Sequence, residues 1–133
     1  MTKDELLQLA QQIVDANDIA LVGTISLKRY PNIKALKKMK NEGLKTFYFS
    51  TRLDSAKVKQ MKRRNKGSIY FYDRASYQGV MIEGKYKVEN NTTVGISELY
   101  SLDAHDPYNF CTVKFVAEAV YVYTHYQTVK IEI

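Results

Sequence analysis

The sequence predicts a mainly β (α+β) fold: a closed or partly closed barrel of six or seven strands with short helices at its periphery. About seven strand-like runs are separated by short polar turns, and only a few segments show helical periodicity. An open sheet of this size would leave long edges to protect, whereas closure removes them. The 133 residues contain no repeat, linker or low-complexity segment, so we expect a single domain over residues 1–133.

The first expected element is a helix. Thr2 and Glu5 have the T-x-x-E spacing of a capping box. Apolar residues then recur at helical spacing up to about Asn17: Leu6, Ala10, Ile13 and Val14.

Strands follow wherever β-branched and aromatic residues alternate between turn signals. After a turn at Lys28–Asn32, Gly43 is expected to supply a positive φ in the turn Asn41–Gly43, and Gly84 a bulge or tight bend. The expected strands are Ile19–Ser26, Ile33–Met39, Thr46–Ser50, Ser68–Tyr72 and Gly79–Glu89, and two more within Phe110–Ile133 around a turn near His125–Gln127.

Two further helices are expected. Ser55–Arg64 should be a helix with Ala56, Val58 and Met61 facing inward, ended by Gly67 as its cap. Thr92–Leu102 should be a short helix, before a loop at His105–Asn109. Its inward residues would be Ile96, Leu99 and Tyr100.

Composition excludes several classes of protein. The single cysteine, Cys111, rules out an internal disulfide and is typical of a reducing cytoplasm. With only two histidines, His105 and His125, we expect no metal site. The longest apolar run, Ala119–Tyr123, is far shorter than the roughly 18 residues of a membrane span. The N-terminal residues are too polar and acidic for a signal peptide, so we expect a cytoplasmic protein with no membrane contact.

The net charge of +6 indicates an anionic partner, either nucleic acid or a phosphorylated small molecule. The 11 tyrosines, interleaved with basic residues, would fit a single-strand binder, although most alternate within strands as in any β-sheet. The excess charge gathers in two clusters: Lys34, Lys37, Lys38 and Lys40, and then Lys57, Lys59, Lys62, Arg63, Arg64 and Lys66. Two solvated basic faces would give the same pattern.

The stretch Lys45–Arg64 combines features that suit a phosphate group. An aromatic strand ends in Ser50 and Thr51, and Ser55 then opens a short basic helix with Lys57 in its first turn. Orphan N–H groups and the positive end of a helix dipole attract an anion, and hydroxyl and ammonium groups add donors and charge. An ordinary strand, turn and helix with a serine cap would show the same residues, so both interpretations stay open.

The order of these pieces resembles the FMN-binding split-barrel family, which includes pyridoxamine 5′-phosphate oxidase and small general-stress flavoproteins. The resemblance covers about Asp18–Val88, with PNIKAL, FYFST, SAK, KRRNKG, SIYFYD and VMIEGKYKV in the family's order. Its most specific pieces are Phe49-Ser50-Thr51 followed by Ser55-x-Lys57, and Ile82-Glu83-Gly84. It implies one FMN-binding split-barrel domain over residues 1–133, with six or seven strands, Greek-key-like connections and FMN as the cofactor.

The same resemblance implies a set of cofactor-binding residues. Ser50, Thr51, Ser55 and Lys57 would hold the flavin phosphate. The basic position on the preceding strand is usually arginine in the family and is Lys34 here, so a point charge replaces a bidentate fork. The backbone at Ala35 and Leu36 would run along the edge of the flavin ring.

Two further positions follow from the family pattern. A glutamine often precedes the V-x-I-E-G strand; here Gly79 follows Gln78, which displaces its register by one residue and turns the side chain to the opposite face unless a bulge intervenes. Tyr77 has a comparable claim as a wall of the site, or packs simply against the sheet. Both are kept as expected cofactor-binding residues.

The oxidase of the family's name is not expected, because the C-terminal Arg-x-His element that grips its substrate is missing from a chain with no arginine after Arg74. The resemblance also implies a homodimer with a flavin site built from both chains. We expect no catalytic role for His105 or His125, and Cys111 should be a core residue; the catalytic residues are unknown.

Three classes of function follow. The first is an FMN-dependent oxidoreductase or flavin reductase that acts on a small-molecule acceptor. The second is a non-catalytic binding module of the same fold, for FMN storage, haem or deazaflavin. The third, less favoured, is a basic nucleic-acid-binding barrel. A stoichiometric yellow chromophore would exclude the third.

Overall fold

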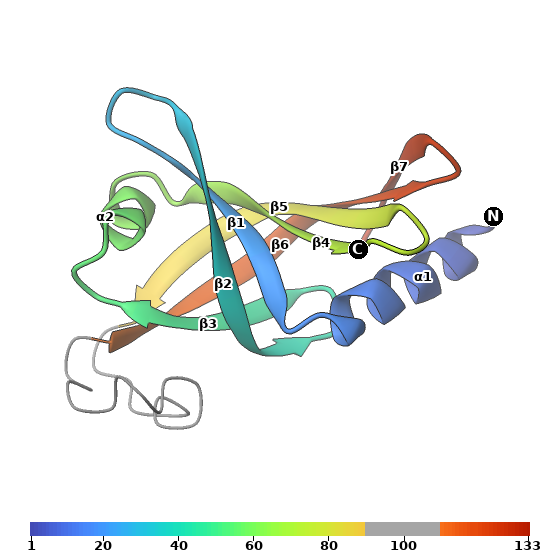
Figure 1. Ribbon diagram of the computed structural model, residues 1–133, viewed down its shortest axis with the longest axis horizontal. Helices are drawn as coiled ribbons and strands as arrows, with labels where there is room; N and C mark the ends of the chain where they lie inside the picture. The colour runs from blue at the N-terminus through green and yellow to red at the C-terminus, as the bar shows by residue number, and fades with distance from the viewer. Residues whose placement is uncertain (90–109) are drawn as a thin grey trace.

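The computed structural model describes residues 1–89 and 110–133. Two helices and seven strands follow one another along this part of the chain (Figure 1). They are α1 (Lys3–Ala16), β1 (Ile19–Ile25), β2 (Pro31–Glu42), β3 (Thr46–Arg52), α2 (Ala56–Arg63), β4 (Lys66–Asp73), β5 (Gln78–Glu89), β6 (Phe110–Thr124) and β7 (Gln127–Ile131). No helix in the described part is both long and apolar enough to cross a membrane.

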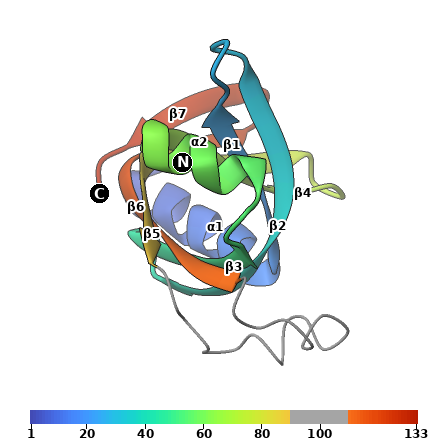
Figure 2. The same ribbon diagram turned by 90° about the vertical axis from the view of Figure 1, so that its left-hand side faces the viewer.

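Six strands close into an antiparallel barrel. The sheet order is β3-β2-β1-β4-β5-β6-β7, and an additional pairing of β3 with β6 closes the ring and leaves β7 outside it (Figure 2). Strands β1 to β3 form a meander, and β4 returns beside β1, which is the 4-1-2-3 order of a Greek key. The predicted mainly β barrel with short peripheral helices is confirmed.

Alternation along the strands fills the barrel with aromatic rings. The side chains of Phe47, Phe49, Phe71 and Phe115 are fully buried, and the Phe47 ring lies 5.6 Å from that of Phe71 and 6.4 Å from that of Phe115. These centroid distances are within the usual range for aromatic pairs. Cys111 is buried as well, as expected.

The two helices lie at opposite ends of the barrel (Figures 1 and 2). At one end, α1 starts with the predicted capping box at Thr2 and Glu5 and buries the apolar stripe that its spacing predicted. The Lys38 ammonium donates to the carbonyl oxygen of Val14 at 2.8 Å, near the C-terminal end of α1. Cations are favourable at that end of a helix dipole, so β2 helps to fix α1. At the other end, α2 buries Val58, Gln60 and Met61.

The predicted inward face of α2 needs one correction. Ala56, expected to face inward, is exposed, and Gln60 is buried in its place. The reason is a tertiary hydrogen bond, because the Thr24 hydroxyl in β1 donates to the Gln60 side-chain oxygen. A buried amide is tolerated when it has such a partner.

The predicted helix cap at Gly67 is wrong. Arg64 is the C-cap of α2, and Gly67 lies inside β4. A β-carbon at Gly67 would overlap the ring of Tyr86 and lie 2.5 Å from the carbonyl oxygen of Gly23. The Tyr86 hydroxyl donates to that same Gly23 oxygen at 2.7 Å. Gly67 is therefore required by close packing across three strands rather than by a turn.

The predicted turns are confirmed with shifted limits. Gly43 has the expected positive φ of 58°, but β2 continues to Glu42, so the turn covers Gly43–Lys45. The register of β5 against β6 shifts between Glu83 and Gly84, at the predicted bulge. The last turn lies at His125 and Tyr126. The expected helix at Thr92–Leu102 and the loop at His105–Asn109 lie outside the described residues.

We expect Gly67→Ala and Gly67→Asn each to lower the free energy of unfolding by at least about 2 kcal/mol, because overpacking in a filled core costs about 1–3 kcal/mol and a second backbone contact is added. Urea unfolding measures this. Asparagine at Gly43, which has a positive φ and open space around it, is the matched control and should cost less than about 1 kcal/mol. A cap at Gly67 would instead tolerate asparagine, so a stable Gly67→Asn protein would contradict the packing account.

Candidate functional site

The barrel opens between β2 and β3. The last residues of β2, Lys38–Glu42, pair with β3, whereas Pro31–Lys37 pair with β1 alone. From Ser50 onward β3 pairs with β6 alone. In the described part of the chain, one edge of β2 over these residues therefore has no ladder partner, and Figure 1 shows β2 rising away from β3 toward the β1–β2 turn. Unpaired strand edges present N–H and C=O groups to whatever lies beside them.

The start of α2 lies at this opening. The turn after β3 is short, and the Ser55 N–H donates to the carbonyl oxygen of Arg52 at 3.2 Å. Ser55 is the N-cap of α2, and its hydroxyl oxygen accepts from the Val58 N–H at 3.4 Å. A serine cap satisfies one of the free N–H groups of the first turn and leaves its own hydroxyl hydrogen to donate. Lys57 follows in that first turn.

Lys34 and Lys57 lie close enough to repel each other. Burial lowers the pKa of Lys57 below its ordinary value of 10.5, the Lys34 ammonium lowers it further, and Cys111 opposes both effects. Neither lysine has a hydrogen bond or ion pair with any residue in the described ranges. Two ammonium groups without a counter-charge, one of them half-buried, create a local positive potential that favours an anion.

The hydroxyl residues of β3 lie on both faces of the strand. Phe47, Phe49 and Thr51 alternate on the barrel side, so Ser50 points to the other face. Thr51 pairs with Cys111 in β6, and burial raises the pKa of that thiol while Lys62 and Lys57 lower it. Thr51 therefore lies beside Cys111, whose thiol interacts with the ammonium group of Lys57. Lys34, Ser55 and Lys57 thus lie at the opening between β2 and β3, whereas Ser50 and Thr51 are buried, with 0% and 4% of their surface exposed.

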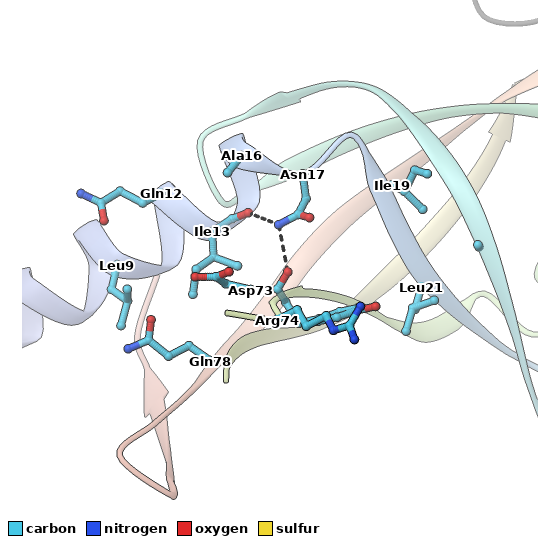
Figure 3. Close-up of a pocket in the computed structure, with 12 residues that line it drawn as sticks. Leu9, Gln12, Ile13, Ala16, Asn17, Ile19, Leu21, Asp73, Arg74 and Gln78 are labelled. Atoms are coloured by element: carbon cyan, nitrogen blue, oxygen red, sulfur yellow. Dashed lines mark hydrogen bonds between the residues drawn. The ribbon is translucent and has the colours of Figure 1, made fainter. Parts of the chain in front are cut away.

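Ala35 points to the outer face of β2 and Leu36 into the core. The N–H and C=O groups of Leu36 face β1, because those of Tyr30 and Lys38 on the same side of β2 bond to that strand and its flanking residues, so only the backbone of Ala35 faces the opening. Ala35 lines a groove of about 720 Å³ between α1 and the outer face of β1 and β4 (Figure 3). A second hollow of about 640 Å³ adjoins it. The two share five lining residues: Leu21, Tyr72, Asp73, Arg74 and Gln78.

Gln78 and Tyr77 point to different places. The Gln78 side chain donates to the Thr124 hydroxyl at 2.8 Å and accepts from the Ser76 hydroxyl at 2.9 Å. Figure 3 shows it extending toward α1. Tyr77 has a positive φ of 54° and contacts the rings of Tyr123 and Tyr126. Both residues line the second hollow, but the amide of Gln78 is already bonded within the protein.

Several lining residues were not predicted from the sequence. Leu21, Tyr70, Tyr72, Arg74 and Tyr123 all line the hollow and belong to β1, β4, the β4–β5 turn and β6. Alternation could have placed Tyr70 and Tyr72 on one face, since Ile69 and Phe71 are the apolar residues on the other. That Leu21 in β1 lies beside these tyrosines could not have been predicted from the sequence, because it depends on the pairing of β1 with β4.

Comparisons with known proteins agree with the fold described above. A family model described as Pyridoxamine 5′-phosphate oxidase matches residues 6–121. The chain is similar to a Clostridium acetobutylicum protein described as related to general stress protein 26 of B. subtilis (pyridoxinephosphate oxidase family), with 29% identity and a TM-score of 0.86 over 100% of this chain and 97% of that one. General stress protein 26 from Bacillus anthracis is 12% identical, with a TM-score of 0.73 over 96% of this chain and 99% of that one.

Two more distant structures share the fold. An F420 reductase is 10% identical, with a TM-score of 0.71 over 83% of this chain and 94% of that one. A haem-binding protein from Mycobacterium smegmatis is 10% identical, with a TM-score of 0.70 over 96% of this chain and 57% of that one. No curated protein sequence matches the chain.

Replacing Lys57 by methionine should raise the free energy of unfolding by about 0.5–2 kcal/mol in low-salt buffer without phosphate, because it removes a half-buried charge that repels Lys34. Since the pKa of Lys57 is lowered in the folded protein, the unfolded chain binds more protons as the pH approaches 10.5. The wild type therefore gains stability in that range, and its difference from the variant shrinks.

Urea unfolding at several pH values measures both effects. Lys59→Met, which changes an exposed lysine of the same helix, is the control and should stay within about 0.5 kcal/mol of the wild type. A Lys57→Met protein that is less stable than the wild type would show that Lys57 has a stabilising partner and is not an uncompensated charge.

Proposed function

The chain belongs to the pyridoxamine 5′-phosphate oxidase family and is similar to general stress protein 26, and from this we propose that it is a flavoprotein that binds FMN. In our proposal it acts as an oxidoreductase or flavin reductase on a small-molecule acceptor, as a homodimer. We do not propose the oxidase activity of the family's name, because no arginine follows Arg74 in this sequence, where the resemblance would require one to grip that enzyme's substrate.

The observation that carries the proposal is the pair of lysines at the opening of the barrel. Lys34 and Lys57 repel each other and have no counter-charge among the described residues. The N-terminal turn of α2 and the Ser55 hydroxyl lie at the same place. A phosphate dianion between the two ammonium groups would remove their repulsion and accept hydrogen bonds from the helix terminus.

The unpaired edge of β2 suits the polar rim of a flavin ring. Beyond Lys34, the N–H and C=O groups of Ala35 point away from β1 and have no partner strand in the described part of the chain, whereas those of Leu36 face β1. A ring with alternating acceptors and donors can satisfy such an edge. The phosphate site and the ring site would then be consecutive along one strand.

The flavin would supply the electron transfer, and the protein would supply position and charge. Lys34 and Lys57 would hold the phosphate, and the β2 backbone would orient the ring. The ammonium groups of Lys34 and Lys37 raise the positive potential along β2. A negative charge on bound reduced flavin would be stabilised by that potential.

A homodimer is supported by the apolar outer face of the barrel. Leu21 has Ala35 and Tyr70 as its neighbours in the adjacent strands. The nearby Ile19 and Ile33 are 54% and 69% exposed. A contiguous apolar face of this kind marks an interaction surface, and a second copy of the chain is the commonest partner for one.

The second candidate function is a non-catalytic module that binds haem or a deazaflavin. The F420 reductase and the haem-binding protein have the same fold. No group of three or more metal-ligating side chains was found among the described residues. An absorbance spectrum separates the two, because a haem gives a Soret band and FMN gives the two flavin bands.

We expect the purified protein to retain about one FMN per chain after incubation and desalting. Lys57→Ala should weaken FMN binding by about 1–3 kcal/mol, the size of a charge-assisted hydrogen bond. Lys34→Arg should preserve or tighten binding, because arginine can form a bidentate pair with phosphate. Fluorescence titration with FMN measures the affinity of the wild type and of the Lys57→Ala and Lys34→Arg variants.

Lys59→Ala is the matched control, since Lys59 is in the same helix and exposed; it should bind FMN like the wild type. Equal affinities for Lys57→Ala and Lys59→Ala would contradict the phosphate assignment. A large loss of FMN affinity in Lys34→Arg would show that Lys34 does not occupy the family's phosphate-binding arginine position. A colourless protein that rejects FMN would contradict the flavoprotein proposal as a whole.

A further inference from the structure

The end of α2 and the residues after it form a basic surface. Residues 56–66 contain six lysines and arginines and no acidic residue. Lys62 and Arg63, in the last turn of α2, are exposed, whereas Val58 and Met61 on the other side of the helix are buried. Cations are favourable at the C-terminal end of a helix dipole, which explains part of this charge. The dipole acts only within the last turn, so it does not explain the lysines of the adjoining strands.

The basic surface continues onto the strands beside the end of α2. The Tyr86 N–H in β5 donates to the carbonyl oxygen of Asn65 at 2.7 Å, which places the residues after α2 against β5. In the sheet, Lys66 of β4 lies directly opposite Lys85 of β5. Both lysines are exposed. The cations at the end of α2 and those of β5 therefore belong to one surface.

Like charges face each other twice in this part of the sheet. Besides Lys66 and Lys85, Lys87 of β5 lies directly opposite Lys114 of β6. Like charges directly opposite each other destabilise an antiparallel pair. One carboxylate reduces the repulsion, because Lys85 forms an ion pair with Glu118 at 3.6 Å, although both side chains are about half exposed. The side chains of Lys66 and Lys87 form no hydrogen bond or ion pair within the described residues.

We name these six cations the basic band: Lys62, Arg63, Lys66, Lys85, Lys87 and Lys114. Acidic residues limit the band on both sides. On the side of α2, Lys59 lies near the carboxylate of Asp54. Across β6, the residue opposite Lys114 is Tyr48 of β3, whose hydroxyl donates to Glu42 at 2.8 Å. The uncompensated charge is therefore concentrated in the band itself.

The basic band lies away from the apolar face that we assign to the homodimer. That face is centred on Leu21 in β1. The strand order places β6 across the barrel from β1, with β4 and β5 between them on one side and β2 and β3 on the other. Lys114 therefore points away from the homodimer face. None of the residues expected to bind the cofactor belongs to the band, although Lys57 is in the first turn of the same helix.

The surroundings of the band favour a partner that is bound by charge alone. None of the exposed large hydrophobic side chains in the described ranges belongs to α2, β3, β5 or β6. Protein and membrane interfaces usually include such side chains. A nucleic acid is instead held mainly by cations that contact its phosphates. A single strand is also flexible enough to follow the outer surface of a barrel.

We infer that the basic band binds the phosphate backbone of a single-stranded nucleic acid. Contacts to phosphates carry no sequence information, so the binding is independent of sequence. The nucleic acid is a second ligand beside the proposed FMN and not an alternative to it. Because the band lies outside the opening between β2 and β3, the inference does not depend on the proposed function.

The test is fluorescence anisotropy of a labelled oligothymidine of about 20 nucleotides, titrated with the purified protein at several salt concentrations. The logarithm of the affinity should fall against the logarithm of the salt concentration with a slope of about −3 or steeper, since each phosphate contacted contributes about −0.7. Lys87→Gln combined with Lys114→Gln should weaken binding at least about 10-fold in about 50 mM salt and make the slope shallower by about 1.4. Lys62→Gln combined with Arg63→Gln should weaken binding by a similar factor.

Lys3→Gln combined with Lys130→Gln is the matched control, because both lysines are exposed and lie between α1 and β7, outside the band. It lowers the net charge equally and should bind oligothymidine like the wild type. An equal loss in this control would overturn the inference, since net charge alone would then explain the binding. Lys87→Arg combined with Lys114→Arg keeps the charge and should also bind like the wild type. A loss in that variant would contradict a role for charge.

Two further results would count against the band. A loss of affinity in only one of the two glutamine pairs would show that α2 and the strands do not form one site. Binding to vesicles that contain phosphatidylglycerol, without binding to oligothymidine, would overturn the inference in favour of a membrane surface.

Titration of the FMN-loaded protein separates this inference from the proposed function. We expect oligothymidine to bind with unchanged affinity and to release no FMN. Competition between the two would overturn the inference, because the strand would then occupy the phosphate site at Lys34 and Lys57. A protein that rejects FMN but binds oligothymidine through the basic band would support the inference and contradict the flavoprotein proposal.

Discussion

Strand β3 is held along its full length by β6 but by β2 only along half of it, and the rest of the site depends on this asymmetry. The β3–β6 pairing runs from Thr46 opposite Val116 to Arg52 opposite Phe110. It is anchored at Lys45, whose carbonyl oxygen accepts from the Ala117 N–H at 2.8 Å and whose ammonium donates to the Ala117 carbonyl at 2.7 Å. Because β3 follows β6 past Phe49, it diverges from β2 and carries α2 to the open end of the barrel. The opening is thus a consequence of strand register.

Two lysines on the same face of β2 show how position decides the role of a charge. Lys38 donates to the Val14 carbonyl at the end of α1, and although burial lowers its pKa, Asp15 and Asp18 oppose that shift. Its charge is compensated within the protein. Lys34, four residues earlier in β2, lies near another cation, Lys57. The charge of Lys38 is compensated, whereas the charges of Lys34 and Lys57 are not, and their repulsion lowers the stability of the fold. A bound anion would offset that loss of stability.

Local patterns in the sequence predicted most of the elements, and the errors lie where a distant residue decides. The capping box, the strands, Gly43 and the bulge at Gly84 depend on neighbours along the chain or on turn chemistry. Gly67 was misassigned because a helix cap and a close approach both call for glycine, and only the contact with Tyr86 distinguishes them. Gln60 is buried where Ala56 was expected to be, because its side-chain oxygen accepts a hydrogen bond from the Thr24 hydroxyl. The phosphate-binding residues were predicted from one contiguous stretch and a family pattern, whereas the hollow lined by Tyr70 and Tyr72 joins residues of β1, β4 and β6 that no local pattern connects.

The most direct test of the central claim, that the opening between β2 and β3 recognises a phosphate, compares FMN with riboflavin by calorimetry on the wild-type protein. The two ligands have the same ring and differ in the phosphate. The account predicts that FMN binds at least about 100-fold more tightly, since two or more charge-assisted hydrogen bonds of about 1.5–3 kcal/mol each are available only to the phosphate. The preference should shrink as salt is added, because part of the site is exposed. Equal affinity for FMN and riboflavin would contradict the account.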